Sequence, residues 1–204
     1  MNPTNNFGLV DLISTRAIDR YRISSDASHF LLIPEGVATP LDIESISLLF
    51  RHAAMTQKSV TFRSGGTSLS GQAVTDGILI DTRRHFRGIE LLHGGAQVKV
   101  QPGATVRTVN ARLARMGRKL GPDPASEIAC TIGGVIANNS SGMACGIAEN
   151  TYQTLESATV LLANGEIINT DDWDSDAQLK AKASDLYQTL GQIKEEISAR
   201  PDLI

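Results

Sequence analysis

The spacing of apolar residues predicts an alternation of strands and one helix in the first third of the chain. Residues 30–37 (FLLIPEGV), 59–64 and 77–82 are short apolar runs typical of strands. After the first run, apolar residues recur at helical spacing up to about Met55, with Thr39 as the expected N-cap of the helix. The order strand, helix, strand, loop, strand predicts a small α/β lobe.

Two hairpins are predicted in the remainder of the chain. Residues 87–103 alternate between apolar and polar side chains around a central Gly-Gly, which is typical of a β-hairpin. Residues 156–170 have the same character, with Asn164 and Gly165 at the expected tip.

Two helices complete the pattern. Residues 104–116 place apolar side chains on one helical face, and Gly117 is the expected C-cap. The arginines of that helix fall mostly on other faces, which predicts a solvated basic surface; they are Arg107, Arg112 and Arg115. Residues 177–199 carry an apolar stripe in a four-three pattern, which predicts one amphipathic helix packed against a core.

Composition narrows the function classes without naming one. The chain has 204 residues and a net charge of −3, so we do not expect nucleic acid as a partner. Its first residues lack the pattern of a signal peptide, so none is expected, and the sequence contains no apolar run long enough for a membrane span. Cys130 and Cys145 form no metal-ligand or CxxC spacing, and the four histidines are dispersed. We therefore expect two buried, reduced thiols, no metal site and a cytoplasmic location.

The most informative segment is RSGGTSLSGQ, residues 63–72, which directly follows a predicted strand. Gly66 and Gly71 have the spacing of a phosphate-binding P-loop, but Gln72 and Ala73 stand where that motif needs Lys and a hydroxyl residue. Consecutive glycines nevertheless let backbone N–H groups converge on an anion, with no cation involved. This loop alone leaves open whether it is an anion cradle or a tight, solvated turn.

Two further segments favour the cradle. GPDPAS, residues 121–126, is stiffened by two prolines, and TIGGVIANNSSG, residues 131–142, again combines bare backbone with neutral polar groups. Such loops are suited to a large planar ligand with a phosphate tail. Three of them in one chain are difficult to explain as turns.

Together with the later ANGEII, these motifs resemble one family of flavoproteins. In their order and character they are similar to the FAD-binding domain of the vanillyl-alcohol oxidase, or PCMH-type, family, over about Phe30 to Ile168. The branch that the chain most resembles contains D-lactate dehydrogenase, the glycolate oxidase D subunit and D-2-hydroxyglutarate dehydrogenase. Residues 138–155 are most similar to large bacterial proteins that fuse this flavin domain to an iron–sulfur domain.

The resemblance implies an α+β fold with two lobes and FAD extended between them. The first lobe is a small α/β unit at about 30–86. The second, at about 87–204, has a larger mixed or antiparallel sheet with helices. Residues 1–29 are expected to form an N-terminal helical extension.

The resemblance also implies which residues contact FAD. Backbone amides of the first loop would hold the pyrophosphate, at Ser64, Gly65, Gly66, Thr67, Ser68, Gly71 and Gln72. The ribityl and isoalloxazine side would be lined by Pro122, Asp123, Ser126, Gly133, Gly134 and Asn138. Ser141, Gly142 and Gly146 would close over the cofactor, and Ile167 or Ile168 would meet the adenine. Some relatives attach the flavin through a His after the double glycine; that position is Thr67 here, so FAD is expected to be bound non-covalently.

The implied reaction is the oxidation of a D-2-hydroxy acid, such as lactate, glycolate or 2-hydroxyglutarate, to the 2-oxo acid. In the family, a C-terminal domain supplies the substrate-binding and catalytic residues, and this sequence contains no counterpart. We therefore expect the FAD-binding part of a longer enzyme, with an iron–sulfur centre as a candidate electron acceptor and no assignable catalytic residue. The alternatives are a stand-alone flavin-binding module without turnover, or a binder of another nucleotide.

Overall fold

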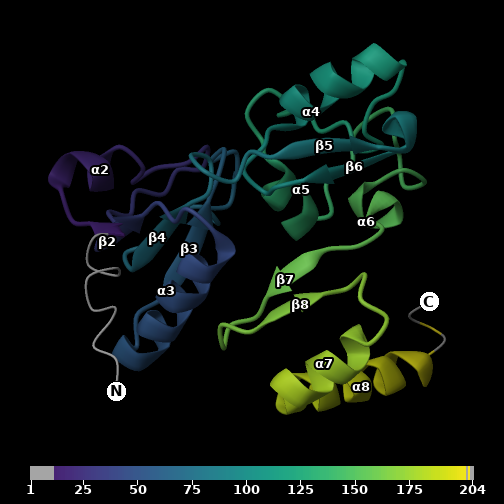
Figure 1. The fold of residues 1–204 in the computed structure, drawn as a ribbon. Helices are drawn as coiled ribbons and strands as arrows, with labels where there is room; N and C mark the ends of the chain where they lie inside the picture. Colours follow the sequence, from purple (N-terminus) through teal and green to yellow (C-terminus); the bar gives the residue numbers. More distant parts are fainter. Residues whose placement is uncertain (1–11, 201, 203–204) are drawn as a thin grey trace. The chain divides into compact units, whose positions relative to one another are not determined.

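The computed structural model describes residues 12–200 and residue 202, and the chain forms two compact units, Met1–Leu155 and Glu156–Ile204 (Figure 1). Of the expected N-terminal extension at 1–29, residues 1–11 lie outside the described part. The remainder contains a short strand, β1 (Ile13–Ser14), and a helix, α2 (Ala17–Tyr21). The boundary expected near residue 86 falls inside the first unit.

A four-stranded sheet organises the beginning of the first unit. It consists of β1, β2 (Gly36–Ala38), β4 (Ile78–Asp81) and β3 (Val60–Arg63), in that spatial order. Strand β4 pairs in parallel with β2 on one side and β3 on the other, and every β4 residue is buried. A parallel strand with neighbours on both sides is expected to be apolar throughout, and the sequence ILID largely fits that rule. The predicted order of elements in this lobe (strand, helix, strand, loop, strand) is therefore confirmed.

The first predicted strand lies in a different place. Residues 30–37 were expected to be extended, but β2 begins only at Gly36 and runs to Ala38. Leu31 makes an isolated bridge to Ser25 instead. Pro34 has no N–H to donate to a ladder, so it separates the exposed apolar residues before it from the strand after it.

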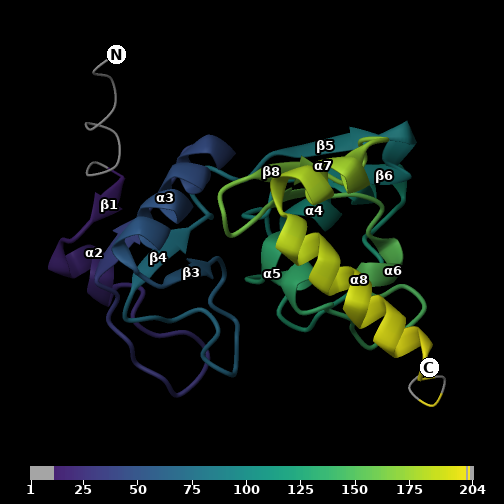
Figure 2. The same cartoon turned by 90° about the horizontal axis from the view of Figure 1, so that it is seen from below.

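Helix α3 (Ile43–Thr56) runs alongside the sheet (Figures 1 and 2). Its existence is confirmed, but its predicted cap is wrong. Asp42 is the N-cap, because its carboxylate accepts a hydrogen bond of 2.8 Å from the Ser45 N–H, and Thr39 lies before the helix. The Asp-x-x-Ser pattern competes with the Thr-Pro signal, and the residue nearer the apolar stripe prevails.

The rest of the first unit packs helices and turns against a β-ribbon. Strands β5 (Ile89–Leu92) and β6 (Gln97–Val100) form the predicted antiparallel hairpin, closed by a 3₁₀ turn, η1 (His93–Gly95). Helix α4 (Val106–Leu113) continues into a second 3₁₀ turn, η2 (Ala114–Met116), and ends at Gly117 in the left-handed conformation. Both predictions are confirmed. Buried Val109 and Leu113 of α4 pack on the ribbon. Two short helices follow, α5 (Ile132–Ala137) and α6 (Thr151–Thr154).

The second unit contains a hairpin and two helices. Strands β7 (Thr159–Leu161) and β8 (Ile167–Asn169) pair antiparallel as predicted, with Gly165 at a φ of 85° in the connecting loop. The sheets of the expected second lobe are thus two separate two-stranded ribbons. Helix α7 (Ser175–Lys182) is anchored to the hairpin by a 2.9 Å bond from Lys182 Nζ to the Ile167 carbonyl.

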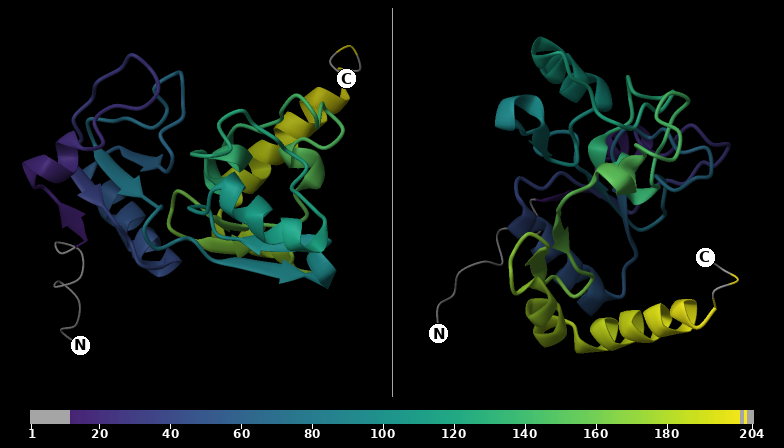
Figure 3. Two further views of the ribbon diagram at one scale, coloured as in Figure 1. Left: turned by 90° about the horizontal axis from the view of Figure 1, so that it is seen from above. Right: turned by 90° about the vertical axis from the view of Figure 1, so that its right-hand side faces the viewer.

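The single helix predicted at 177–199 is wrong. The chain breaks at Ala183 and restarts as α8 (Ser184–Ser198), as the right-hand view of Figure 3 shows. Ala183 has a φ of −148° and a ψ of 61°, which are not helical values, and no side chain caps the start of α8. The apolar stripe of α8 was expected to pack against a core, but its residues are 41% to 48% exposed: Leu186, Leu190, Ile193 and Ile197. None of the described helices combines the length and apolar character needed to cross a bilayer.

Candidate functional site

The loop between β3 and β4 leaves the sheet at the carboxyl ends of two parallel strands, where ligands commonly bind in such sheets. It lies beside the segment that joins α2 to β2 (Figure 3, left). The Ala27 N–H donates to the Gly66 carbonyl at 3.0 Å. The Asp26 carboxylate accepts from the N–H groups of Ser28 at 2.9 Å and Ala73 at 3.3 Å. These bonds fix the loop from outside.

Inside the loop, one hydroxyl sets the backbone conformation. Ser68 Oγ accepts hydrogen bonds from the N–H groups of Ser70 at 3.1 Å and Gln72 at 3.2 Å. The amide of Gln72, one of the predicted pyrophosphate contacts, is therefore already used. Gly66 and Gly71 have φ values of 65° and 75°, which a residue with a side chain rarely adopts.

The remaining amides of the predicted cradle are available. The N–H groups of Gly65, Gly66, Thr67 and Ser68 donate no hydrogen bond to any residue that the structure describes. Consecutive backbone donors without internal partners can bind an anion when their N–H groups converge. A side chain at Gly65 would overlap the Ala129 carbonyl, so the glycine lets this loop lie directly against the residues between the second and third motifs.

A buried cation, which the sequence pattern did not predict, lies behind the cradle. Arg63 is only 9% exposed and its guanidinium lies against Gly66. Nη1 donates to the carbonyls of Ala73 at 3.2 Å and Ile23 at 3.4 Å, whereas Nε has no partner in the described structure. The signal was present, because Arg63 directly precedes the glycine loop, but only the structure shows that the side chain turns inward.

Burial changes the electrostatics of Arg63. Desolvation, followed by the nearby charge of Arg83, lowers the pKa of Arg63, against the opposing charges of Asp26 and Asp81. The guanidinium nevertheless stays protonated. No described carboxylate lies within ion-pair distance of it. An unpaired buried charge is costly, and a bound anion at the loop would offset that cost.

Asp123, predicted to line the ligand, also has a structural role. Its carboxylate accepts from the N–H groups of Ala144 at 3.0 Å and Cys145 at 3.1 Å, and these bonds lower the pKa of Asp123. Gly142 leaves no room for a side chain against the same residue. Asp123 thus holds the segment after α5 in place. Its neighbour Pro122 is buried.

The other predicted residues of this region surround α5. The Ser126 carbonyl accepts from the Cys130 N–H at 2.8 Å, and the Gly133 N–H donates to the Pro102 carbonyl at 2.9 Å. Gly134 is exposed, and a side chain there would meet nothing within 4 Å. Asn138 accepts from the Ser140 hydroxyl at 2.6 Å. Ser141 and Gly146 are exposed. The structure therefore brings the second and third motifs together within the first unit.

Ile167 and Ile168, the predicted adenine contacts, lie on β8 of the second unit. Ile168 is buried and Ile167 is half-buried. The two cysteines are free and buried, as expected, and burial raises the pKa of the Cys130 thiol.

Residues 34–171 match the family described as FAD binding domain. The chain belongs to this family. It is 30% identical over 200 residues to a D-2-hydroxyglutarate dehydrogenase of Pseudomonas putida, covering 93% of this chain and 20% of that protein. It is 29% identical over 137 residues to glycolate oxidase subunit GlcD of Escherichia coli, covering 66% of this chain and 28% of that one.

The fold of this FAD-binding domain is also found among solved structures. A chitooligosaccharide oxidase superposes with a TM-score of 0.70 at 20% identity, over 89% of this chain and 38% of that one. The PCMH-type fold inferred from the motifs is thereby confirmed. The chain spans about a fifth of the length of the D-2-hydroxyglutarate dehydrogenase that it matches.

The residues present fit FAD. Free backbone donors at Gly65–Ser68 suit the diphosphate, and the unpartnered Nε of Arg63 beneath them lacks a counter-charge that a diphosphate would supply. The open face at Gly134 leaves space for a planar group.

Proposed function

We propose that this chain is the flavin-binding part of an oxidoreductase that converts a D-2-hydroxy acid into the 2-oxo acid. The observation that carries the proposal is the row of free amides at Gly65–Ser68 above the buried guanidinium of Arg63. The similarity to D-2-hydroxyglutarate dehydrogenases and to glycolate oxidase subunit GlcD supports the substrate class.

Bound FAD would supply the hydride-accepting ring, and the protein would supply position and charge. The amides of Gly65, Gly66, Thr67 and Ser68 would orient the diphosphate. Gly71 and the Gln72 side chain would complete the loop, whose neighbouring hydroxyls, Ser64 Oγ and Thr82 Oγ1, lie 2.7 Å apart.

The segments around α5 would hold the remainder of FAD. Asp123 and Gly142 would shape the backbone there, rather than contact the ligand through a charged group. The ribityl and ring side would be lined by Pro122, Ser126, Gly133, Gly134, Asn138, Ser141 and Gly146, and the adenine would meet Ile167 or Ile168.

Attachment would be non-covalent, because Thr67 offers no imidazole or thiol at the position after the double glycine. The test is a visible absorption spectrum of the purified protein, followed by denaturation. Flavin bands that leave with the small-molecule fraction as FAD support the proposal. Colour retained on the denatured chain contradicts non-covalent attachment, and a protein that neither carries nor takes up FAD contradicts the flavin site.

Turnover is a separate question, because the relatives are much longer than this chain. We propose that substrate binding and proton abstraction depend on residues outside these 204, with an iron–sulfur centre as the candidate electron acceptor. The competing proposal, a flavin-binding module without turnover, rests on the same length difference. A panel of D-2-hydroxy acids with an artificial electron acceptor separates them, since only an enzyme reduces the acceptor in a substrate-dependent way.

A further inference from the structure

Positive charge is concentrated in one part of the first unit. Residues 83–119 contain nine lysines and arginines and a single acidic residue, Glu90, although the whole chain has a net charge of −3. This segment includes the β5–β6 ribbon, α4 and η2. The sequence predicted a solvated basic surface on this helix, and Arg107, Arg112 and Arg115 are all exposed.

The one carboxylate of this segment does not face the arginines of α4. Ile89 and Leu91 lie on the face of the ribbon that packs against α4. Successive side chains of a strand point to opposite faces, so Glu90 between them lies on the other face, with Lys99 as its partner in the register. The side of the ribbon that meets α4 therefore contributes no negative charge.

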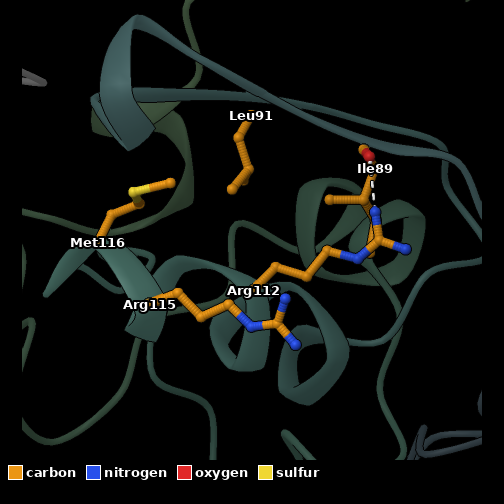
Figure 4. A pocket seen from close by; sticks show the side chains of 5 residues that line it. All are labelled: Ile89, Leu91, Arg112, Arg115 and Met116. Carbon is orange, nitrogen blue, oxygen red and sulfur yellow. Dashed lines mark hydrogen bonds between the residues drawn. The ribbon is translucent and has the colours of Figure 1, made fainter.

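The arginines of α4 and η2 also lack ion pairs elsewhere. Arg107, Arg112 and Arg115 form no ion pair with any carboxylate that the structure describes. Arg112 Nη1 instead donates to the Ile89 carbonyl at 2.8 Å, as Figure 4 shows. This bond positions the guanidinium against the ribbon, while its charge and its other N–H donors remain available to a partner.

Beside these arginines the surface is hollow and largely apolar. A pocket of about 480 Å³ is lined by Ile89, Leu91, Arg112, Arg115 and Met116. The side chains of Leu91 and Met116 point toward each other in Figure 4. The turn η1 supports Met116 from behind, because a side chain at Gly95 would come within 3.2 Å of the Met116 Cβ. None of the residues predicted to contact FAD lines this pocket.

We propose that this basic surface, the pocket with Arg112 and Arg115 at its side, docks an acidic segment of a partner protein. An aliphatic side chain of the partner would fill the pocket, and carboxylates flanking it would meet the two guanidinium groups. Arginine and methionine are enriched in protein interfaces, and complementary charges accelerate association and select the partner. Nucleic acid fits less well, because the pocket lining has no aromatic side chain on which a base could stack.

Fluorescence anisotropy can test this interaction with the full chain and without FAD. The probe is a labelled peptide with a central pair of leucines that glutamates flank on both sides. It should bind, and its affinity should fall as the NaCl concentration rises, because salt screens exposed charges. Replacing the glutamates with glutamines, or the leucines with alanines, should in each case weaken binding.

Variants of the protein locate the contact. Arg115→Gln should weaken binding about threefold, which is typical of an exposed ion pair. Met116→Gln should weaken it about fivefold, because the exposed half of this side chain would otherwise leave water on binding. Both residues are exposed, so neither change should lower the melting temperature. Arg16→Gln is the matched control, since it removes the same charge at an exposed position outside this surface and should leave binding unchanged.

Three results would overturn the inference: no binding of the leucine–glutamate peptide, equal losses in Arg115→Gln and Arg16→Gln, or equal affinity for the peptide with alanines. A single-stranded oligonucleotide that binds more tightly than the peptide, and loses affinity in Arg115→Gln, would assign the surface to nucleic acid instead. The interaction involves no FAD contact, so these outcomes are independent of the proposed flavin site.

Discussion

Two adjacent glycines of α5 have different structural environments. Gly133 lies against Pro102, where an added methyl group would crowd the ring, whereas nothing lies within 4 Å of the position a side chain would take at Gly134. Packing within the fold therefore explains why residue 133 is a glycine, but it does not explain why residue 134 is one. In a six-residue helix, a glycine that the fold does not need suggests that a ligand needs it.

Gly134→Ala should consequently raise stability and lower affinity for FAD. Alanine in an open helical position stabilises the fold by up to about 1 kcal/mol, while the added methyl group would occupy space meant for the cofactor. Thermal unfolding and FAD titration measure the two effects, and we expect at least about a tenfold loss of affinity.

Gly191→Ala is the control, because Gly191 in α8 is equally unobstructed. It should stabilise the protein without affecting FAD. Unchanged FAD affinity in Gly134→Ala would remove Gly134 from the site.

Asp81 at the end of β4 should make stability depend on pH. Burial of the carboxyl raises its pKa, but hydrogen bonds from Arg83 and the charges of Arg83 and Arg22 outweigh burial, so the pKa is lowered in the folded state. The ionised form therefore stabilises the fold above the unfolded pKa of about 3.9, and that contribution is lost as the pH falls through the folded value.

Asp81→Asn should cost about 2 kcal/mol at pH 7, because Arg83 loses its charged partner, and should flatten the acid limb of stability. Denaturant unfolding between pH 7 and pH 3 measures both. Asp76→Asn, at an exposed neighbour, should resemble the wild type throughout. An unchanged acid limb in Asp81→Asn would contradict the assignment.

At the residue scale, the sequence identified the glycine-rich loops but not the charges around them. Arg63 was visible as the residue before the loop, yet whether it turned inward depended on carbonyls of Ile23 and Ala73, distant in the chain. Asp123 was assigned to ligand lining, and the sequence did not show that its carboxylate also accepts hydrogen bonds from Ala144 and Cys145. Such roles depend on tertiary contacts that no local pattern encodes.

Among the elements, the start of α3 provides a direct test of competing capping signals. Asp42→Ala should cost about 1 kcal/mol, because the Ser45 N–H loses its acceptor. Thr39→Ala should change stability by less than about 0.5 kcal/mol. Chemical denaturation compares the two, and a larger loss in Thr39→Ala would restore the cap expected from the sequence.

Strands and hairpins with a strong apolar periodicity were predictable from the sequence, but the residues at which elements begin and end were not. The β5–β6 and β7–β8 hairpins follow their alternation and turn residues. The strand predicted at 30–37 was wrong because the apolar residues extend to both sides of Pro34, whereas the paired strand β2 begins only at Gly36. The apolar stripe at 177–199 likewise continued across Ala183, where the backbone leaves the helical conformation.

For the whole molecule, FAD should raise the melting temperature. A ligand that binds only the folded state stabilises it by about 2.7 kcal/mol at a hundredfold excess over Kd. For a chain of this size the shift should be about 5–10 °C. Differential scanning fluorimetry without added dye, at increasing FAD, measures it, and riboflavin, which lacks the diphosphate, is the control. Equal shifts with both would contradict a diphosphate cradle.

The α+β fold of the PCMH type was predictable from the ordered glycine-rich motifs, whereas the lobe boundary expected near residue 86 lies inside the first compact unit. Periodicity alone yielded the strand–helix–strand order of the first lobe. It could not show that β4 would insert between β2 and β3, since strand order depends on pairing across long loops.

That insertion has a consequence for protein synthesis. In the described sheet, β2 and β3 each pair in parallel only with β4, which is made after both. A nascent chain that has emerged only as far as β3 therefore presents two strands with unpaired edges, and the glycine-rich loop has no second anchor. Until residues 78–81 have left the ribosome, the unpaired edges of β2 and β3 can pair with other chains. A chaperone that covers these edges would prevent such aggregation.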